Sequence, residues 1–381
     1  MSLAINRLLR GSKPGAPDKP TIDRFLREHT FPIVEGTHST FVFHGDVDAV
    51  YLRHWVFGLG SDQPFHRIDG TDLWYLTIEV PPRSRVEYKF EIHKGGHGTW
   101  IRDPLNPHLA HDPFGANSVC QAEGYETPDW VSPDPEARPG SLEEVILEDT
   151  PFGDNRRLTI YLPARFRSTR RYPLLVVHDG GDYLRYSALK TVLDNLIHRL
   201  EVAPMIVALT HPKDRLVEYA NDPAHADFIV QRVLPYMEGR FPLFPAAGAR
   251  CLMGASFGGV ASLSTAWRYP GRFGRLLLQS GSFAFTDIGE NRRGPVFDRV
   301  VSFVNAFREA PGRPSEKVFV SCGTYESLIY ENRSMVPLLQ TTGMDIRYEE
   351  ARDGHNWENW RDRLRTALSW LFPGPLWMVY E

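Results

Sequence analysis

The first third of the chain carries short runs in which apolar and polar residues alternate, separated by turn residues. The runs lie between Ser39 and about Gln121 and read STFVFHG, DAVYLRHW, DLWYLTIEV, VEYKFEIHK, TWIRDP and NSVCQAE. A period of two is typical of strands with one buried face, and several short strands in succession are typical of an antiparallel sandwich. We therefore predict a small all-β, immunoglobulin-like sandwich domain over residues 36–125.

After residue 142 the pattern changes to uninterrupted apolar runs that alternate with amphipathic helical segments. Five of these runs read PLLVVHDG, PMIVALTH, RCLMGAS, RLLLQSGS and KVFVSCGT. Strands that are apolar throughout are buried on both faces, and helices between them provide the crossover connections of a parallel sheet. The second pattern therefore predicts an α/β domain with a mostly parallel central sheet over residues 142–381.

Two segments follow neither pattern. Residues 126–141, ETPDWVSPDPEARPGS, are rich in proline and acidic residues and are interpreted as a linker. Residues 1–35 are interpreted as an N-terminal arm with one short helix, TIDRFLREHT, whose Thr21 and Asp23 suit a helix start.

Composition narrows the class of protein. The 381 residues are 42% hydrophobic and 24% charged with a net charge of -4, which is ordinary for a soluble protein and gives no electrostatic reason to expect nucleic acid as a partner. No apolar run is long enough to span a membrane, and the first residues lack the features of a signal peptide, so we expect a cytoplasmic protein. Three scattered cysteines, Cys120, Cys251 and Cys322, are expected to be reduced thiols. The sequence leaves the oligomeric state open.

The segment GASFGG, residues 254–259, lies between an apolar strand and a helix start. A nucleophile elbow needs a serine on a sharp strand-to-helix turn with small residues on either side, here Ser256 between Gly254 and Gly258. The N–H of Phe257 would be the first donor to an oxyanion. The alternative interpretation is that the glycines only allow a helix to pack closely on the sheet.

A catalytic serine requires a base and an acid that follow it in the chain. His355, in DGHNWENW after the last predicted strand, is the expected base. Glu326 directly follows the strand KVFVSCGT and is our first choice for the acid, with Glu331 and Asp287 as alternatives. Asp353 is expected to stabilise the loop of His355.

Further candidates lie in loops at the same edge of the predicted sheet. In HDGGDY, the N–H of Gly181 is expected to be the second oxyanion donor, with Gly180 as the alternative. Arg185 and Arg215 are candidates for binding an anionic substrate, as is Arg333. His93 and His97 stand four residues apart on a glycine-rich hairpin, a poor setting for a metal site, so we expect neither metal nor cofactor.

With these motifs in place, the chain resembles the enterochelin esterase family within the esterase D-like α/β hydrolases. The resemblance rests on HDGGDY, GASFGG, SCGTYE and DGHNWENWRDRL, and on DGTDLWYLTIEVPPRSRVEYKF and DPLNPH in the predicted sandwich. It implies an α/β-hydrolase fold, a triad of Ser256, His355 and an acid, and hydrolysis of the trilactone of an imported ferric catecholate siderophore in the cytoplasm. The rivals are a feruloyl or acetyl esterase with a glycan-binding sandwich, and a binding protein on a hydrolase scaffold.

Overall fold

The chain divides into two units by its internal contacts. The computed structural model describes residues 3–11, 16–286 and 294–374. Unit 1 comprises Met1–Thr127 with two short segments from far along the chain, Thr324–Ser327 and Ala351–Asn356, and unit 2 comprises Pro128–Gly323, Leu328–Glu350 and Trp357–Glu381. We refer to the two short segments as the 324–327 segment and the 351–356 segment.

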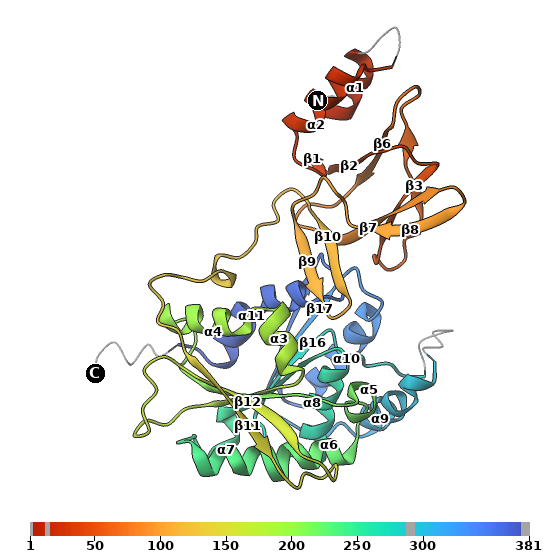
Figure 1. The fold of residues 1–381 in the computed structure, drawn as a ribbon. Helices are drawn as coiled ribbons and strands as arrows, with labels where there is room; N and C mark the ends of the chain where they lie inside the picture. Colours follow the sequence, from red (N-terminus) through yellow and green to blue (C-terminus); the bar gives the residue numbers. More distant parts are fainter. Residues whose placement is uncertain (1–2, 12–15, 287–293, 375–381) are drawn as a thin grey trace. The chain divides into compact units, whose positions relative to one another are not determined.

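Unit 1 contains two sheets whose strands pair antiparallel, which confirms the predicted sandwich (Figure 1). The sheet orders are β1-β2-β6-β5 and β4-β3-β7-β10-β9, with β8 paired to β7. The strands are β1 Ile33–Glu35, β2 His38–His44, β3 Ala49–His54, β4 Gln63–Pro64, β5 His66–Arg67, β6 Leu73–Glu79, β7 Arg85–Lys94, β8 His97–Ile101, β9 Leu109–Asp112 and β10 Gly115–Gln121. Strands β1, β4, β5 and β9 were not predicted, because two to four residues are too few to show an alternation.

The N-terminal arm forms two helices that pack on the sandwich. They are α1 Ala4–Gly11 and α2 Lys19–Glu28. Ile5 of α1 and Phe25 of α2 are buried in one cluster with Val42 of β2. The predicted helix start at Thr21 and Asp23 was wrong, because the N-cap is Asp18, whose carboxylate accepts a hydrogen bond from the N–H of Thr21.

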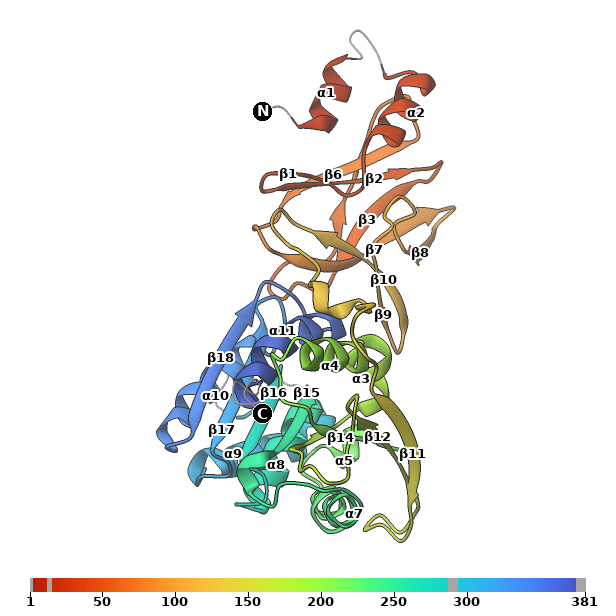
Figure 2. The same ribbon diagram turned by 90° about the vertical axis from the view of Figure 1, so that its left-hand side faces the viewer.

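Unit 2 is built on one eight-stranded sheet of order β11-β12-β14-β13-β15-β16-β17-β18 (Figures 1 and 2). The strands are β11 Ser141–Leu147, β12 Arg156–Leu162, β13 Leu174–Val177, β14 Ile206–Thr210, β15 Arg250–Ala255, β16 Arg275–Gln279, β17 Lys317–Gly323 and β18 Asp345–Ala351. Strands β11 and β12 pair antiparallel, whereas β14, β13, β15, β16 and β17 form a continuous parallel block. This arrangement confirms the predicted α/β-hydrolase fold.

Helices cover both faces of this sheet. The α-helices are α3 Gly180–Tyr186, α4 Leu189–His198, α5 Arg215–Glu218, α6 Pro223–Asp227, α7 Leu234–Arg240, α8 Phe257–Arg268, α9 Asp298–Glu309, α10 Ile329–Thr341 and α11 Trp357–Leu371. Three 3-10 turns, Asp129–Val131, Ala247–Ala249 and Pro295–Phe297, and a π-helical stretch, Phe228–Val233, complete the described elements. Helix α6, the π-helical stretch and α7 follow one another without a break, and Pro235, which has no N–H to donate, lies where regular helical bonding restarts.

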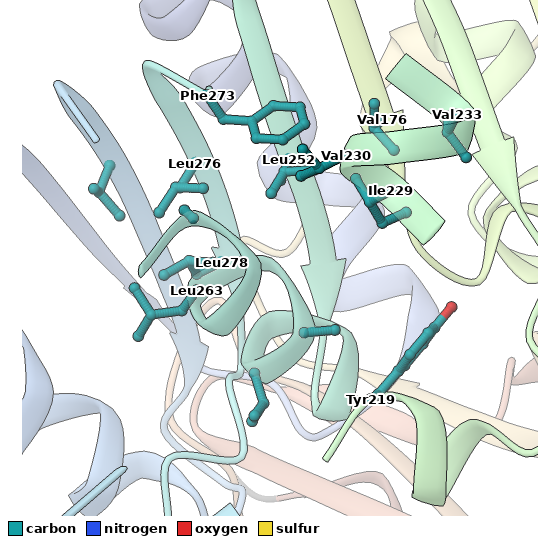
Figure 3. Packing of buried hydrophobic residues seen from close by; sticks show 14 of the residues in the cluster. Val176, Tyr219, Ile229, Val230, Val233, Leu252, Leu263, Phe273, Leu276 and Leu278 are labelled. Carbon is teal, nitrogen blue, oxygen red and sulfur yellow. The ribbon is translucent and has the colours of Figure 1, made fainter. Parts of the chain in front are cut away.

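Alternate residues of each central strand enter two different cores, which explains why these strands are apolar throughout. Leu252 lies in the cluster shown in Figure 3, together with Leu276 and Ile229, whereas its neighbour Met253 lies in a second cluster with residues of α4 and α11. Cys251 and Cys322 are buried thiols, as is Cys120 of unit 1, in agreement with the expected reduced state. Among the described residues, no helix combines the length and the apolar character needed to cross a membrane.

A buried histidine pair lies beneath the end of β13. Nδ1 of His178 donates to the carbonyl of Met253 at 3.0 Å, so Nε2 of His178 accepts from Nε2–H of His225, also at 3.0 Å. Burial lowers the pKa of His178 to about 4 and lowers the pKa of His225 well below its usual value. Both rings are therefore neutral in the folded protein.

This pair predicts a loss of stability in acid. Below about pH 6.5 both histidines are protonated in the unfolded chain but not in the folded chain. The free energy of unfolding therefore has its full value above about pH 6.5 and decreases as the pH falls towards about 4. We expect the difference in free energy of unfolding between wild type and His225→Gln to shrink by about 1.4 kcal/mol per pH unit between pH 6 and 5. Urea unfolding of unit 2 at several pH values measures it, with exposed His97→Gln as the control. Equal pH dependence in wild type and His225→Gln would contradict the prediction.

Candidate active site

Ser256 occupies a strained turn between β15 and α8. Its φ of 58° and ψ of -121° lie in a region that residues other than glycine rarely adopt. The turn is held on both sides, because the N–H of Ser256 donates to the carbonyl of Gln279 and its carbonyl accepts from the N–H groups of Gly259 and Ser282. The strand, turn and helix follow one another as GASFGG predicts.

Both interpretations of the glycines in this motif apply. A Cβ added to Gly254 would lie 2.3 Å from the carbonyl oxygen of Gly258, so the first turn of α8 passes directly over the end of β15. A Cβ added to Gly259 would lie 3.1 Å from Cα of Gly281. The glycines therefore provide close packing, and that packing is what allows the strained turn at Ser256.

The Ser256 hydroxyl lies beside a second serine and the start of a helix. Its Oγ is 3.1 Å from Oγ of Ser282, a buried residue that follows β16. Phe257 is the first residue of α8, and the first N–H groups of a helix have no acceptor within the helix. Ser282 was not predicted, although its position just after an apolar strand is a signal that could have found it.

The segment with Gly180 and Gly181 is the start of helix α3, where a loop was expected. Strands β13 and β15 are parallel neighbours with Val177 opposite Met253, so α3 and α8 begin at the same edge of the sheet. A Cβ added to Gly180 would lie 2.3 Å from Cβ of Leu209, which makes close packing on β14 the reason for that glycine. The N–H of Gly181 belongs to the first turn of α3.

Arg215 joins the starts of these two helices. Its Nε donates to both carboxylate oxygens of Asp179, the N-cap residue of α3, at 3.0 and 2.9 Å, and its Nη2 donates to the carbonyl of Ala255 at 3.1 Å. Burial raises the pKa of Asp179, and the nearby guanidinium opposes that rise. This internal ion pair was not predicted, and a role of Arg215 in binding substrate stays a prediction.

The other two arginine candidates differ from each other. Arg185 is exposed on α3, with its guanidinium 5.2 Å from the centre of the Tyr186 ring. Arg333 of α10 forms two hydrogen bonds with the carboxylate of Glu350, at 2.7 and 2.6 Å. A substrate carboxylate or phenolate would therefore compete with Glu350 for Arg333.

The structure brings His355 and Glu326 together. Nδ1 of His355 lies 2.5 Å from Oε2 of Glu326, whose side chain is 2% exposed against 37% for the histidine. The carboxylate can only accept here, so Nδ1 carries the proton and Nε2 is the nitrogen able to take up another. Their segments are also joined through the backbone, because the N–H of Tyr325 donates to the carbonyl of Asp353.

The structure describes two of the other acidic residues considered for this site. Glu331 is buried in the first turn of α10. Asp353 is buried and accepts hydrogen bonds from the N–H of Gly354 and from Nδ2 of Asn356, in keeping with the loop-stabilising role expected for it. Asp287 lies outside the described residues.

The hairpin histidines do not share a ligand cluster. Nε2 of His93 is 2.9 Å from a carboxylate oxygen of Glu91, and His97 lies on the neighbouring strand β8. Over residues 3–11, 16–286 and 294–374, no three side chains of His, Cys, Asp or Glu gather as a metal site would require.

The fold and the strained serine define an α/β-hydrolase esterase, and comparison with known families agrees. The model of the family described as "Putative esterase" matches residues 150–371. The chain belongs to this esterase family and is a carboxylic ester hydrolase.

The relatives confirm the resemblance to enterochelin esterases. The Iron(III) enterobactin esterase of Escherichia coli O6:H1 is 25% identical over 351 residues, which cover 83% of this chain and 85% of the relative. A crystal structure of the Shigella flexneri enterobactin esterase in the presence of enterobactin has a TM-score of 0.74 at 21% identity and covers 94% of this chain and 99% of that one. A ferulic acid esterase has a TM-score of 0.54 at 20% identity and covers 61% of this chain and 98% of its own.

Proposed function

We propose that the chain hydrolyses esters with Ser256 as nucleophile, His355 as base and Glu326 as the acid. The Ser256 hydroxyl attacks the ester carbonyl while Nε2 of His355 takes its proton, and the buried carboxylate of Glu326 stabilises the resulting imidazolium. His355 then gives the proton to the leaving alcohol. Water, deprotonated by the same imidazole, releases the acyl group and restores the serine.

Three observations support this assignment. Ser256 follows the fifth strand of the eight-stranded sheet, β15, and the segments with Glu326 and His355 follow the seventh and eighth, β17 and β18. This is the chain order serine, acid, histidine of α/β hydrolases. The strain at Ser256 and the short bond between His355 and Glu326 are the local geometries that such a triad needs. The observation that carries the proposal is the turn at Ser256. Its φ of 58° is combined with a ψ of -121°, which lies outside the left-handed region that the helix-capping residues Asp179 and Ala188 occupy.

The oxyanion is proposed to form between the two helix starts. The N–H groups of Phe257 and Gly181 both lie in first turns at the same edge of the sheet, where the helix dipoles also favour negative charge. Each such donor typically contributes about 3 kcal/mol of transition-state stabilisation. Arg215 links the two turns through Asp179 and the carbonyl of Ala255, so it would keep both donors in place.

These contacts predict that replacing Arg215 lowers kcat, whereas replacing Arg185 changes KM. Arg215→Met is expected to lower kcat about 10- to 100-fold with little change in KM, because a misplaced oxyanion donor costs transition-state binding alone. Arg185→Met, on the exposed face of α3, should act on KM if Arg185 contacts the substrate. Steady-state kinetics on one ester separate these outcomes. A rise in KM with unchanged kcat for Arg215→Met would instead assign Arg215 to substrate binding.

For the substrate, we propose the ester trilactone of a ferric catecholate siderophore, cleaved to release iron. The similarity to the Escherichia coli enterobactin esterase extends over 83% of this chain, beyond the part matched by the esterase family model. The structural similarity to the ferulic acid esterase covers only 61% of the chain. The cytoplasmic location expected from the sequence stays a prediction.

A substrate panel tests this proposal. Ferric enterobactin, its linear catecholate esters, feruloyl esters, acetylated sugars and short p-nitrophenyl esters are compared by kcat/KM with the same enzyme preparation. The proposal requires the catecholate trilactone to exceed the feruloyl and acetyl esters by at least about 100-fold, a discrimination of about 2.7 kcal/mol. Preference for a feruloyl or acetyl ester would overturn the substrate and leave the esterase assignment intact.

A further inference from the structure

The histidine and its glutamate partner belong, by contacts, to the unit that contains the sandwich. The 324–327 segment includes Glu326 and the 351–356 segment includes His355, and both are part of unit 1. Their neighbours in that unit are residues of the sandwich, more than two hundred positions earlier in the sequence.

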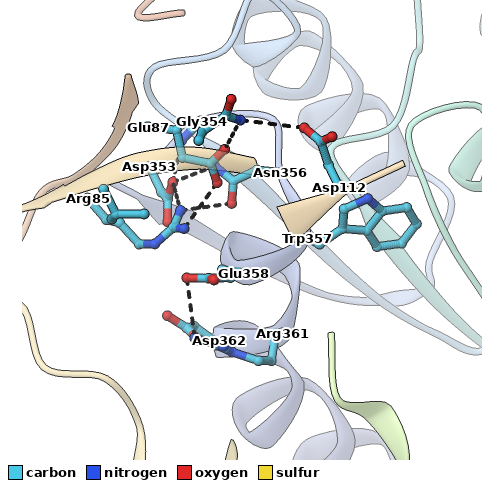
Figure 4. Close-up of polar contacts among 12 residues, drawn as sticks. Arg85, Glu87, Asp112, Asp353, Gly354, Asn356, Trp357, Glu358, Arg361 and Asp362 are labelled. Carbon is cyan, nitrogen blue, oxygen red and sulfur yellow. Dashed lines mark hydrogen bonds and ion pairs between the residues drawn. The ribbon is translucent and has the colours of Figure 1, made fainter. Parts of the chain in front are cut away.

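Arg85, the first residue of β7, makes the most extensive connection (Figure 4). Its Nη1 donates to Oδ1 of Asp353 at 3.3 Å and to Oδ1 of Asn356 at 3.1 Å, and its Nη2 donates to Oε1 of Glu87 at 3.0 Å. Its backbone N–H donates to the carbonyl of Arg352 at 2.9 Å. Arg85 thus binds residues on both sides of His355, and Glu87 binds the guanidinium from within the sandwich.

Arg85 is also an unusual residue to find so deeply enclosed. It is 1% exposed, and a charged side chain is rarely buried unless it is paired and hydrogen-bonded. Its carboxylate partner Asp353 is enclosed too, at 5% exposed. This burial raises the pKa of Asp353 to about 7, and the charge of Arg85 opposes that rise. A buried ion pair is weak evidence for stability, but its hydrogen bonds fix geometry.

Further sandwich residues form hydrogen bonds with the 324–327 segment, which contains Glu326, and with Arg352 of the 351–356 segment. The N–H of Phe57 donates to the carbonyl of Tyr325 at 2.7 Å, and the hydroxyls of Ser84 and Tyr325 lie 2.5 Å apart. Nη1 of Arg352 donates to the carbonyl of Pro82 at 2.7 Å. The residue before Glu326 is therefore bound to the sandwich through both its backbone and its side chain.

We propose that the sandwich acts as the scaffold of the catalytic base, with Arg85 as its principal positioning residue. Arg85 holds Asp353 and Asn356 in place, and these two residues belong to the 351–356 segment, which contains His355. Tyr325 holds the 324–327 segment, which contains Glu326. The sandwich thereby sets the orientation of the imidazole of His355 towards the carboxylate of Glu326. This orientation determines how well Nε2 of His355 can accept the proton of Ser256. This inference rests on the proposed triad and assigns the N-terminal domain a part in turnover.

The test compares Arg85→Met and Arg85→Lys with Arg53→Met in the full-length protein. Arg53 is a fair control because it lies in the neighbouring strand β3 and pairs with Glu91 of the same sheet. For Arg85→Met we expect kcat to fall about 10- to 100-fold with KM within about threefold of wild type, since base orientation contributes mainly in the transition state. Arg85→Lys should recover little of the loss, because an ammonium cannot reproduce the fork geometry. Arg53→Met should behave as wild type.

A spectroscopic readout separates positioning from simple destabilisation. A proton shared between an imidazole Nδ1 and a buried carboxylate gives a downfield proton NMR signal, which Glu326→Gln should abolish. The signal should be broadened or lost in Arg85→Met and kept in Arg53→Met. Should Arg85→Met fail to fold, Tyr325→Phe leaves Arg85 in place, removes the contact with Ser84, and is expected to lower kcat several-fold.

The outcomes distinguish the inference from the proposed function. Wild-type kcat and an unchanged downfield signal in Arg85→Met, in an enzyme that Ser256→Ala inactivates, would overturn the scaffold role and leave the triad standing. Full activity of Ser256→Ala would overturn the triad itself. An effect of Arg85→Met confined to KM would show that the sandwich contributes to substrate binding instead, and would equally overturn the proposal.

Discussion

Replacing Ser256 by alanine is expected to lower kcat for a model ester at least about 10^4-fold, the loss seen when serine hydrolases are deprived of their nucleophile. The reason is that no acyl-enzyme can form, and only substrate binding and the oxyanion donors are left to act on water. Hydrolysis of a p-nitrophenyl ester, followed spectrophotometrically at saturating substrate, measures the effect.

Ser264→Ala provides the matched control. Ser264 lies in α8, eight positions after Ser256, is buried, and its hydroxyl donates to the carbonyl of Ala261. Its loss should leave kcat within about twofold while changing the stability by about as much as the Ser256 variant does. Near-wild-type hydrolysis by Ser256→Ala would contradict the esterase mechanism proposed here.

The second large effect is expected for the glutamate that accepts from His355. Glu326→Gln keeps the shape of the side chain but removes the negative charge that stabilises the imidazolium, and its amide favours the wrong imidazole tautomer. In a comparable triad such an exchange lowers kcat about 10^4-fold, and we expect a loss of about 10^3- to 10^4-fold here. Steady-state kcat, measured alongside the circular dichroism of each variant, gives the result.

Glu331→Gln is the control that decides between the two glutamates. Glu331 is buried like Glu326 and five positions later, in the first turn of α10, so the two exchanges carry similar risks for folding. We expect Glu331→Gln to keep kcat within a few-fold of wild type. A collapse of kcat in Glu331→Gln, with Glu326→Gln active, would transfer the role to Glu331.

Most of the strands and helices could be predicted because burial determines which positions of the sequence are apolar. A strand such as RCLMGA is apolar throughout because Leu252 and Met253 enter different cores, and the helices between strands show the period that one buried face imposes. The turn at Ser256 was also predictable, because Gly254, which has no room for a Cβ, marks the turn in the sequence.

What could not be predicted depends on contacts between residues far apart in the sequence. Asp179 and Arg215 are 36 positions apart and Arg85 and Asp353 are 268 apart, so no local pattern marks either pair. Helix α3 was missed for another reason, because Gly180 is there to pack on Leu209 and two successive glycines are more typical of a loop.

The proposed activation of Ser256, at the turn after β15, by His355 can be measured with a fluorophosphonate probe followed by peptide mass spectrometry. We expect one adduct, on Ser256, formed rapidly by the wild-type enzyme and at least about 10^3-fold more slowly by His355→Ala. An adduct on another serine, no adduct, or equal labelling rates in the two proteins would contradict it.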